Sequence, residues 1–297
     1  MRWSVSYTLI TVFILILWLS VGQTRAEDIP TCSAETDCAT SAWGISADVI
    51  AAYPRPNVTQ TYADNSQLYD RIYRRVNGAI DLYDAPNGNI KGNLGSGFNF
   101  VTLSSQQDGW AQITSDTWVK TDNLTDNVIV SSFAGIKLPE ETLPYPVAWL
   151  LVNLEPAEYP GGEPSDNNEL MLRYTTVNLY STVDVDGWHW YQIGVNRWVK
   201  QTQVARVLPV TRSADIDTER WISVDLYEQV LIAYEGTQPI FATLISSGLP
   251  DWETEEGLFH VYVRYQRTIM SGAEGQKDFY YLEEVPDTMY FNGDTAI

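Results

Sequence analysis

The sequence is poor in the residues from which catalytic and metal sites are most often built. Its 297 residues include only 2 Cys and 2 His, and 18 Lys and Arg stand against 38 Asp and Glu, so the formal net charge is −20. Because so acidic a chain attracts few phosphates through counterion release, we expect no nucleic-acid partner. No His lies near either Cys, and the loop Asp184-Val-Asp-Gly187 has too few ligands for calcium. We therefore expect no metal and no cofactor.

Apolar residues, in contrast, are plentiful. Hydrophobic residues make up 44% of the chain, and the aromatic residues comprise 11 Trp, 18 Tyr and 8 Phe. This composition excludes disorder caused by low hydrophobicity for most of the chain. The length is sufficient for two or three compact units.

The N-terminal apolar run is too short to cross a membrane. It extends from Leu9 to Leu19, broken only by Thr11, whereas a span needs about 20 residues. Arg2 precedes the run and small residues end at Ala26, a pattern typical of a signal peptide. We therefore predict that residues 1–26 direct export to the cell wall, the periplasm or the outside of the cell. Retention of this segment as an anchor is the alternative; after cleavage no integral membrane span is expected.

The stretch that follows the signal is polar. Cys32 and Cys38 lie six residues apart in it, which predicts a small disulfide loop in an exported protein. Residues 27–75 contain Pro54 and Pro56 and show no sustained hydrophobic period. We interpret them as a polar tether, in which residues 48–52 can form a short helical turn.

From Val76 onward, the pattern is typical of β structure and contains an internal repeat. Short β-branched and aromatic runs alternate with Asn-Gly and Asp-Gly pairs, which favour tight turns. The second copy follows the first at offsets of 78 and 80 residues, so it holds two extra residues near His189. We call residues 76–138 the first repeat and residues 145–209 the second repeat. The matching triplets are Asp108-Gly-Trp110 and Trp118-Val-Lys120 in the first repeat, and Asp186-Gly-Trp188 and Trp198-Val-Lys200 in the second.

These triplets resemble the bacterial SH3-like domain, which typically reads DGW or GGW in one strand and WV in a later one. The resemblance implies two small SH3-like β barrels. In that family such modules bind cell-wall peptides or act as spacers. Trp110 and Trp188 are therefore candidate ligand-binding contacts with the wall, and a role in the core is the alternative. For Trp118 and Trp198 the core role is favoured.

Residues 218–297 form a third pattern of short alternating runs, each able to cover one face of a sheet. Four segments in this order and spacing resemble the L,D-transpeptidase catalytic domain, the cysteine enzymes of bacterial cell walls. The resemblance implies a β sandwich. One departure is Glu255, which stands where the family usually has Pro. The four segments are Trp221–Leu226 with Glu228 and Gln229, Ala242–Gly248, Thr254–Phe259, and Met289–Gly293 before Ala296 and Ile297.

The residues that perform catalysis in that family are not found in this chain. In the family, a strand ending like Ala296-Ile297 is followed by a His and, about fifteen residues later, by Ser/Thr-His-Gly-Cys. The thiolate attacks a stem-peptide carbonyl and forms a thioester. No Cys lies beyond Cys38, so we assign no catalytic residue. We expect the chain to be the N-terminal portion of such a domain, an incomplete sandwich, and to be inactive as given.

Other titratable residues favour structural interpretations. His189 and His260 lie in strand-like runs without a nearby nucleophile and orienting acid. The acidic stretch 251–256 is interpreted as a charged loop, which in the family borders the active-site groove. Glu283 and Glu284 are adjacent, so on a strand they point to opposite faces and cannot form a catalytic pair.

Three functions follow from these patterns. The first is an exported, peptidoglycan-modifying L,D-transpeptidase-like protein that acts on stem peptides. The second is a non-catalytic wall-binding protein that works through its SH3-like modules, and the third is an exported spacer or assembly protein. A monomer is expected in each case.

Overall fold

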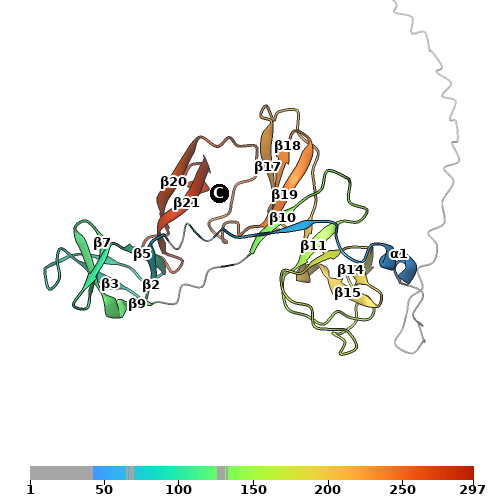
Figure 1. The fold of residues 1–297 in the computed structure, drawn as a ribbon, viewed down its shortest axis with the longest axis horizontal. Helices are drawn as coiled ribbons and strands as arrows, with labels where there is room; N and C mark the ends of the chain where they lie inside the picture. The colour runs from blue at the N-terminus through green and yellow to red at the C-terminus, as the bar shows by residue number, and fades with distance from the viewer. Residues whose placement is uncertain (1–42, 65, 67–69, 126–130, 132) are drawn as a thin grey trace, which may run out of the picture. The chain divides into compact units, whose positions relative to one another are not determined.

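The computed structural model describes residues 43–297, except residues 65, 67–69, 126–130 and 132 (Figure 1). The predicted signal peptide and the predicted disulfide between Cys32 and Cys38 lie outside the described residues. Within them, strands dominate and form five sheets. The helical elements described are α1 (Ala47–Ala52) and two short 3₁₀ helices, η1 (Thr121–Asn123) and η2 (Gln201–Gln203). The prediction of a mainly β protein is confirmed.

Part of the predicted tether is folded. Residues 48–52 belong to α1, and the segment before it is held by Gln192, whose Oε1 accepts the backbone N–H of Ile45 at 2.8 Å. Further along, β1 (Thr59–Tyr62) pairs with β10 (Phe133–Lys137). The sequence of β1, Thr-Gln-Thr-Tyr, has no apolar face. Because strands are predicted from alternating apolar residues, this strand could not be predicted from the sequence.

The second repeat places its strands in two sheets that pack face to face. One sheet has the order β12-β11-β16 and the other the order β13-β14-β15. Neither closes into a barrel on its own within the described residues. The core between them is built from alternate residues, such as Ala148 and Leu150 of β11 and Tyr191 of β14. The bounds are β11 (Val147–Leu150), β12 (Thr176–Asn178), β13 (Ser181–Val185), β14 (Trp188–Gly194), β15 (Arg197–Lys200) and β16 (Val204–Val207).

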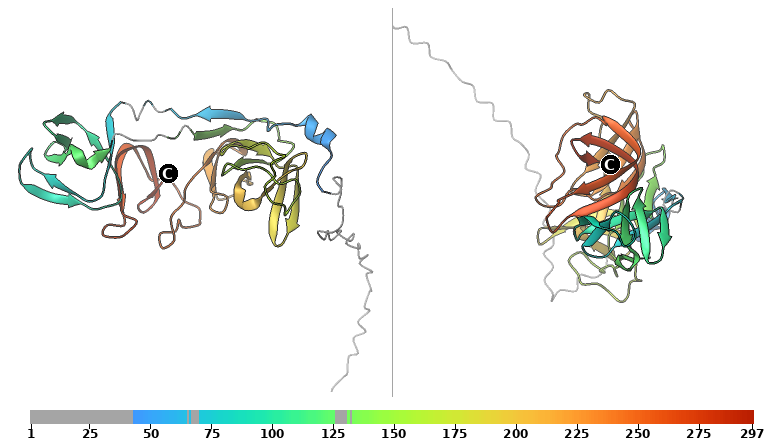
Figure 2. Two further views of the ribbon diagram at one scale, coloured as in Figure 1. Left: turned by 90° about the horizontal axis from the view of Figure 1, so that it is seen from below. Right: turned by 90° about the vertical axis from the view of Figure 1, so that its left-hand side faces the viewer.

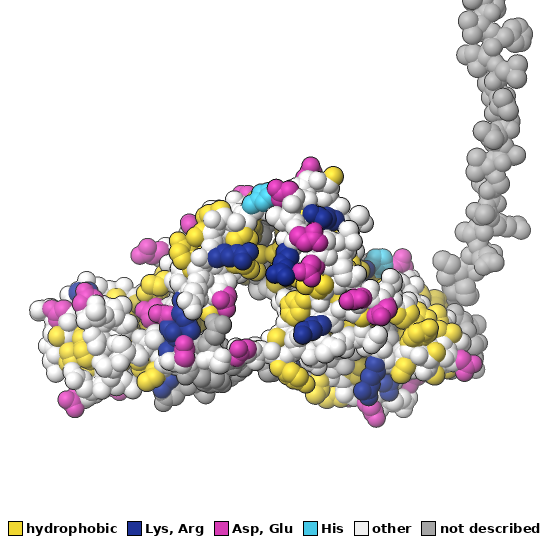
Figure 3. Space-filling view, turned by 45° about the horizontal axis from the view of Figure 1, so that its top comes forward, with side chains coloured by type: hydrophobic (Ala, Val, Ile, Leu, Met, Phe, Trp, Pro, Cys, Tyr) yellow, Lys and Arg dark blue, Asp and Glu magenta, His cyan; other side chains and the backbone are white. Residues whose placement is uncertain are grey.

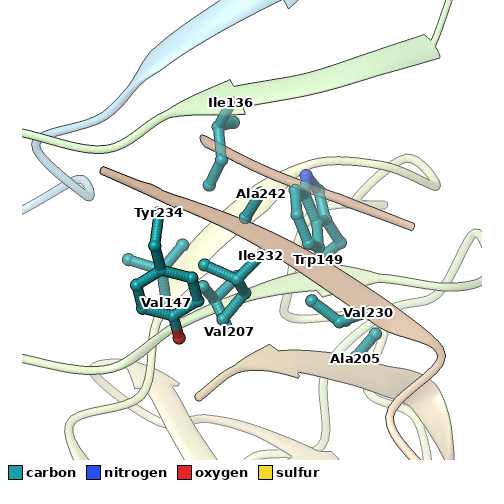
Figure 4. Packing of buried hydrophobic residues seen from close by; sticks show 9 residues of the cluster. All are labelled: Ile136, Val147, Trp149, Ala205, Val207, Val230, Ile232, Tyr234 and Ala242. Carbon is teal, nitrogen blue, oxygen red and sulfur yellow. The ribbon is translucent and has the colours of Figure 1, made fainter. Parts of the chain in front are cut away.

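A five-stranded sheet covers the other face of β11. Its order is β1-β10-β19-β18-β17, and it joins the C-terminal segment to β10. Val147 and Trp149 of β11 pack against residues of this sheet, among them Tyr234, and Figure 4 shows these side chains gathered in one cluster. All four residues of β11 are buried because both faces of the strand are covered. The remaining bounds are β17 (Arg220–Asp225), β18 (Val230–Glu235) and β19 (Gln238–Leu244).

The first repeat also divides its strands between two sheets. One has the order β4-β3-β8-β7-β6, and the other has the order β20-β21-β5-β2-β9, with β22 paired to β21. The bounds are β2 (Ile72–Val76), β3 (Ile80–Tyr83), β4 (Ile90–Leu94), β5 (Phe98–Leu103), β6 (Ser105–Gln107), β7 (Trp110–Thr114), β8 (Thr117–Lys120), β9 (Leu124–Thr125), β20 (Val263–Gly272), β21 (Tyr280–Asn292) and β22 (Thr295–Ala296).

Residues from the C-terminal segment complete the core of the first repeat. β21 pairs in parallel with β5, and Figures 1 and 2 show its hairpin beside the strands of that repeat. Phe279 is buried in the cluster formed by residues such as Val76, Val101 and Val119, and Tyr281 packs against it. The strands of residues 218–297, which the sequence grouped as one incomplete sandwich, are therefore shared between two sheets. Each hairpin satisfies its backbone groups by pairing with an earlier strand.

Strand register corrects the alignment of the two repeats. In the first, Trp110 lies opposite Lys120 and Gln112 opposite Trp118. In the second, the corresponding pairs are Trp190 with Lys200 and Gln192 with Trp198. The structural counterpart of Trp110 is therefore Trp190. Trp188 is an additional residue, contributed by a longer hairpin.

No helix among the described residues is long and apolar enough to cross a membrane.

Candidate functional site

A groove of about 730 Å³ brings together all four segments that carried the second resemblance. Its lining is mainly apolar. The residues that form it include Trp221–Leu226, Tyr227, Val230–Ile232, Ile245–Ser247, Thr254–Phe259, Val261, Phe291 and Thr295–Ile297. These segments are separated by up to 70 residues in sequence, so the groove is a product of the fold.

One side of the groove is the edge strand β17. This strand pairs only with β18 in the five-stranded sheet, and six consecutive residues from Trp221 to Leu226 line the groove. Successive side chains of a strand point to opposite faces. Because the lining also includes Val230–Ile232 of β18, the groove lies over the β17–β18 pair and reaches the sheet edge at β17, where every second residue presents its N–H and C=O.

The other side is formed by the loop after β19 and the end of the chain, and specific contacts fix it. The Oγ1 of Thr254 accepts the backbone N–H of Gly248 at 2.9 Å. Asn292 Nδ2 donates to Glu255 Oε2 at 2.9 Å. The rings of Phe259 and Phe291 lie edge to face with centroids 5.5 Å apart. Residues 254–256 of the acidic stretch thus border the groove.

The charges in the groove have one sign. Among the residues that the structure describes, its lining contains the carboxylates of Asp225, Glu255 and Glu256 and no Lys, Arg or His. On the face shown in Figure 3, hydrophobic side chains reach the surface in several patches, with acidic and basic side chains between them. A ligand with an apolar body and an ammonium group would match the groove best.

Two residues of the family-like motif, Glu228 and Gln229, hold the turn beside the groove. Buried Glu228 accepts hydrogen bonds from the backbone N–H of Arg206 at 2.7 Å and from its Nε at 2.8 Å. Gln229 has a positive φ of 56°, and its side chain bonds both the Oγ and the N–H of Ser247 at 2.8 Å. Their role is to position the walls. Sequence reasoning missed Arg206 because no local pattern links residues that lie 22 positions apart.

The lining holds no Cys and no His. Hydroxyl groups are present on Ser223, Ser246 and Ser247, but none has an imidazole base within the lining. The described residues also contain no cluster of three or more His, Cys, Asp or Glu that could hold a metal ion.

The two candidate wall contacts lie in opposite environments. Trp110 is 6% exposed, with its ring edge to face on Tyr83 at a centroid distance of 4.8 Å. Trp188 is 41% exposed, and Lys200 Nζ lies 3.8 Å from its ring centroid. Of the two, only Trp188 offers a substantial surface to a ligand. Trp198, at 2% exposed, lies in the core, as favoured from the sequence.

The other titratable candidates are dispersed. His189 pairs with Asp184 on the surface of the second repeat, and His260 is exposed in the loop before β20. Glu283 is buried and Glu284 pairs with Arg71, so the two adjacent carboxylates have different surroundings. None of these groups is part of the groove lining.

Comparisons with known proteins add little. No protein-family model and no curated protein matches this chain. Among solved structures, NlpC1 from Trichomonas vaginalis matches with 11% sequence identity and a TM-score of 0.16. The match covers 53% of this chain and 52% of that one, so the chain spans about half the length of the structure it matches. A similarity this low does not establish a shared fold.

Proposed function

We propose that this chain is an exported, peptidoglycan-modifying protein of the L,D-transpeptidase type, and that its groove binds the stem peptide of the cell wall. One observation carries the proposal: the four segments that resemble the catalytic domain line a single groove. Its acidic, mainly apolar character suits a peptide that carries a free amino group. The repeats would then be SH3-like modules and the C-terminal segment part of a β sandwich.

The proposal assigns binding to this chain and no turnover. The nucleophile of the family is a Cys, and this sequence has none beyond Cys38. We expect the chain as given to release no D-alanine from a tetrapeptide donor. Release above background, measured by chromatography, would show that another residue supplies the nucleophile.

Binding is tested with a stem tetrapeptide and a matched pair of variants. Leu258 and Leu249 are 55% and 54% exposed, but only Leu258 lines the groove. Leu258→Arg should weaken tetrapeptide binding about tenfold, because the apolar contact is lost and a cation enters. Leu249→Arg should leave the affinity unchanged. Calorimetric titration that finds equal affinities for both variants would contradict the proposal.

The exposure of Trp188 favours a second candidate function, a non-catalytic wall-binding protein acting through the SH3-like modules. Retention of the full chain on purified sacculi separates the two. Under the first proposal Leu258→Arg reduces retention. Under the second, Trp188→Ala reduces it and Leu258→Arg does not.

A further inference from the structure

The second repeat carries a hairpin extension that the first repeat lacks. In the first repeat, the pairing of β6 with β7 runs from Ser105 with Gln112 to Gln107 with Trp110, and then turns. In the second, the pairing of β13 with β14 continues for two more residue pairs. These are Asp184 with His189 and Val185 with Trp188. We call residues 184–189 the hairpin extension.

One face of the extension presents polar groups to solvent. Directly opposed residues of an antiparallel pair lie on the same face, so Asp184 and His189 are neighbours, and His189 Nδ1 contacts the Asp184 carboxylate. Their side chains are 71% and 50% exposed. An ion pair this exposed contributes little to the free energy of folding.

A chain of hydrogen bonds connects this face to the groove. The backbone N–H of His189 donates to Gln201 Oε1 at 2.7 Å, and Gln201 Nε2 donates to the hydroxyl of Tyr227 at 2.5 Å. Tyr227 is 72% exposed and lines the groove. An exposed aromatic ring thus stands between the groove and the polar pair.

We propose that Tyr227, Gln201 and the Asp184–His189 pair form a subsite for a sugar ring. A pyranose has a face of C–H groups that packs on an aromatic ring and hydroxyl groups at its rim that need donors and acceptors. Tyr227 supplies the ring, Asp184 an acceptor, and Gln201 and His189 mixed donors and acceptors. The inference rests on the proposed function, because a wall stem peptide in the groove is attached to a sugar that must lie beside it.

The test compares three probes: a stem tetrapeptide, the same peptide linked to its disaccharide, and the disaccharide alone. For the unaltered chain, the disaccharide should raise peptide affinity about tenfold, which is the effect of one charge-assisted hydrogen bond. The double variant Asp184→Ala/His189→Ala should abolish this gain and leave tetrapeptide affinity unchanged. Unchanged tetrapeptide affinity also shows that the variant is folded.

The first repeat offers a matched control. Lys91 and Asp116 form an exposed ion pair there, with Nζ and Oδ2 2.7 Å apart. Lys91→Ala/Asp116→Ala should preserve the tenfold gain. The inference is overturned if the disaccharide neither adds affinity nor binds alone, or if both double variants lose the gain equally. If the tetrapeptide fails to bind while the disaccharide binds and Asp184→Ala/His189→Ala removes that binding, the proposed function fails and the sugar subsite stands.

Discussion

The two repeats share sequence triplets but use their aromatic residues differently. The Trp of the first Asp-Gly-Trp triplet is buried, whereas that of the second is exposed beside Lys200. Strand register explains the difference, because Trp110 corresponds to Trp190 and Trp188 belongs to the hairpin extension. Identical triplets at a turn therefore do not identify equivalent positions. The two-pair extension adds residues beyond the shared core, so the Trp of the second triplet is an additional residue that lies on the surface.

The cores of the repeats also differ in their origin. The core between the two sheets of the second repeat is built from residues of that repeat. The core of the first includes Phe279 and Tyr281, which come from about 160 residues further along the chain. One repeat is therefore completed locally, and the other depends on a distant strand.

The largest expected effect tests the equivalence of the Trp residues. Trp110→Ala should lower the free energy of unfolding by about 3–4 kcal/mol, since it removes a buried ring. Trp188→Ala should change it by less than about 1 kcal/mol, because the ring is exposed. Denaturant titration measures both. Equal losses would mean that the triplets, rather than the register, define the equivalent positions.

The dependence of the first repeat on the C-terminal segment is tested next. Phe279→Ala should destabilise that repeat by about 3 kcal/mol through loss of a buried ring. Hydrogen exchange should accelerate in β3, β7 and β8 and stay slow in β14 and β15. Ile269→Ala, an exposed change on the same hairpin, is the control and should leave exchange unaltered. Equal acceleration in both repeats would contradict the comparison.

Two register-equivalent glutamines provide a smaller test. Gln192 holds the N–H of Ile45, whereas Gln112 makes exposed bonds to Ser105 and Ser115. Gln192→Ala should cost about 1–2 kcal/mol, because a partly buried N–H loses its acceptor. Gln112→Ala should cost less than about 0.5 kcal/mol. Limited proteolysis before α1 should increase only for Gln192→Ala, and cleavage that increases in both variants would argue against this role.

The smallest expected effect concerns the buried carboxylate of Glu283. Burial raises the pKa of Glu283 above its ordinary value of 4.5, against the hydrogen bonds from Thr102 N–H and Tyr281 that lower it. Folding therefore favours the protonated form. The associated stability is fully present below pH 4.5 and is lost as the pH rises through the raised pKa. Glu283→Gln should be more stable than the unaltered chain at neutral pH and equal to it in acid.

Denaturant unfolding measured from about pH 4 to pH 8 checks the direction in which stability changes with pH, since this window starts near the ordinary pKa of Glu. Glu228, near the second repeat, is the comparison for Glu283. It is also buried, but it forms an ion pair with Arg206. Glu228→Gln should lose stability at neutral pH, where the ion pair is broken. If Glu283→Gln also loses stability there, the interpretation of Glu283 is wrong.

The sequence predicted what local patterns encode. The β content, the Asp-Gly turns and the core position of Trp198 follow from hydrophobic period and turn residues. The pairings of β1 with β10 and of β21 with β5 were not predicted, because backbone hydrogen bonds between distant strands have no residue signature. The four segments that line the groove were singled out from the sequence, but the groove that they form was not predicted. Its acidic lining and the Gln201–Tyr227 bridge emerge from contacts between elements that are far apart in sequence.

We expect the parallel pairing of β21 with β5 to influence the order of folding as well. A chain made from its N-terminus reaches residue 207 and then holds every residue that builds the core between the two sheets of the second repeat. The first repeat is synthesised earlier but must wait for Phe279 and Tyr281. Long-range pairing forms slowly, and exposed strand edges invite wrong partners meanwhile. We therefore expect the first repeat, although it is synthesised earlier, to complete its core after the second repeat.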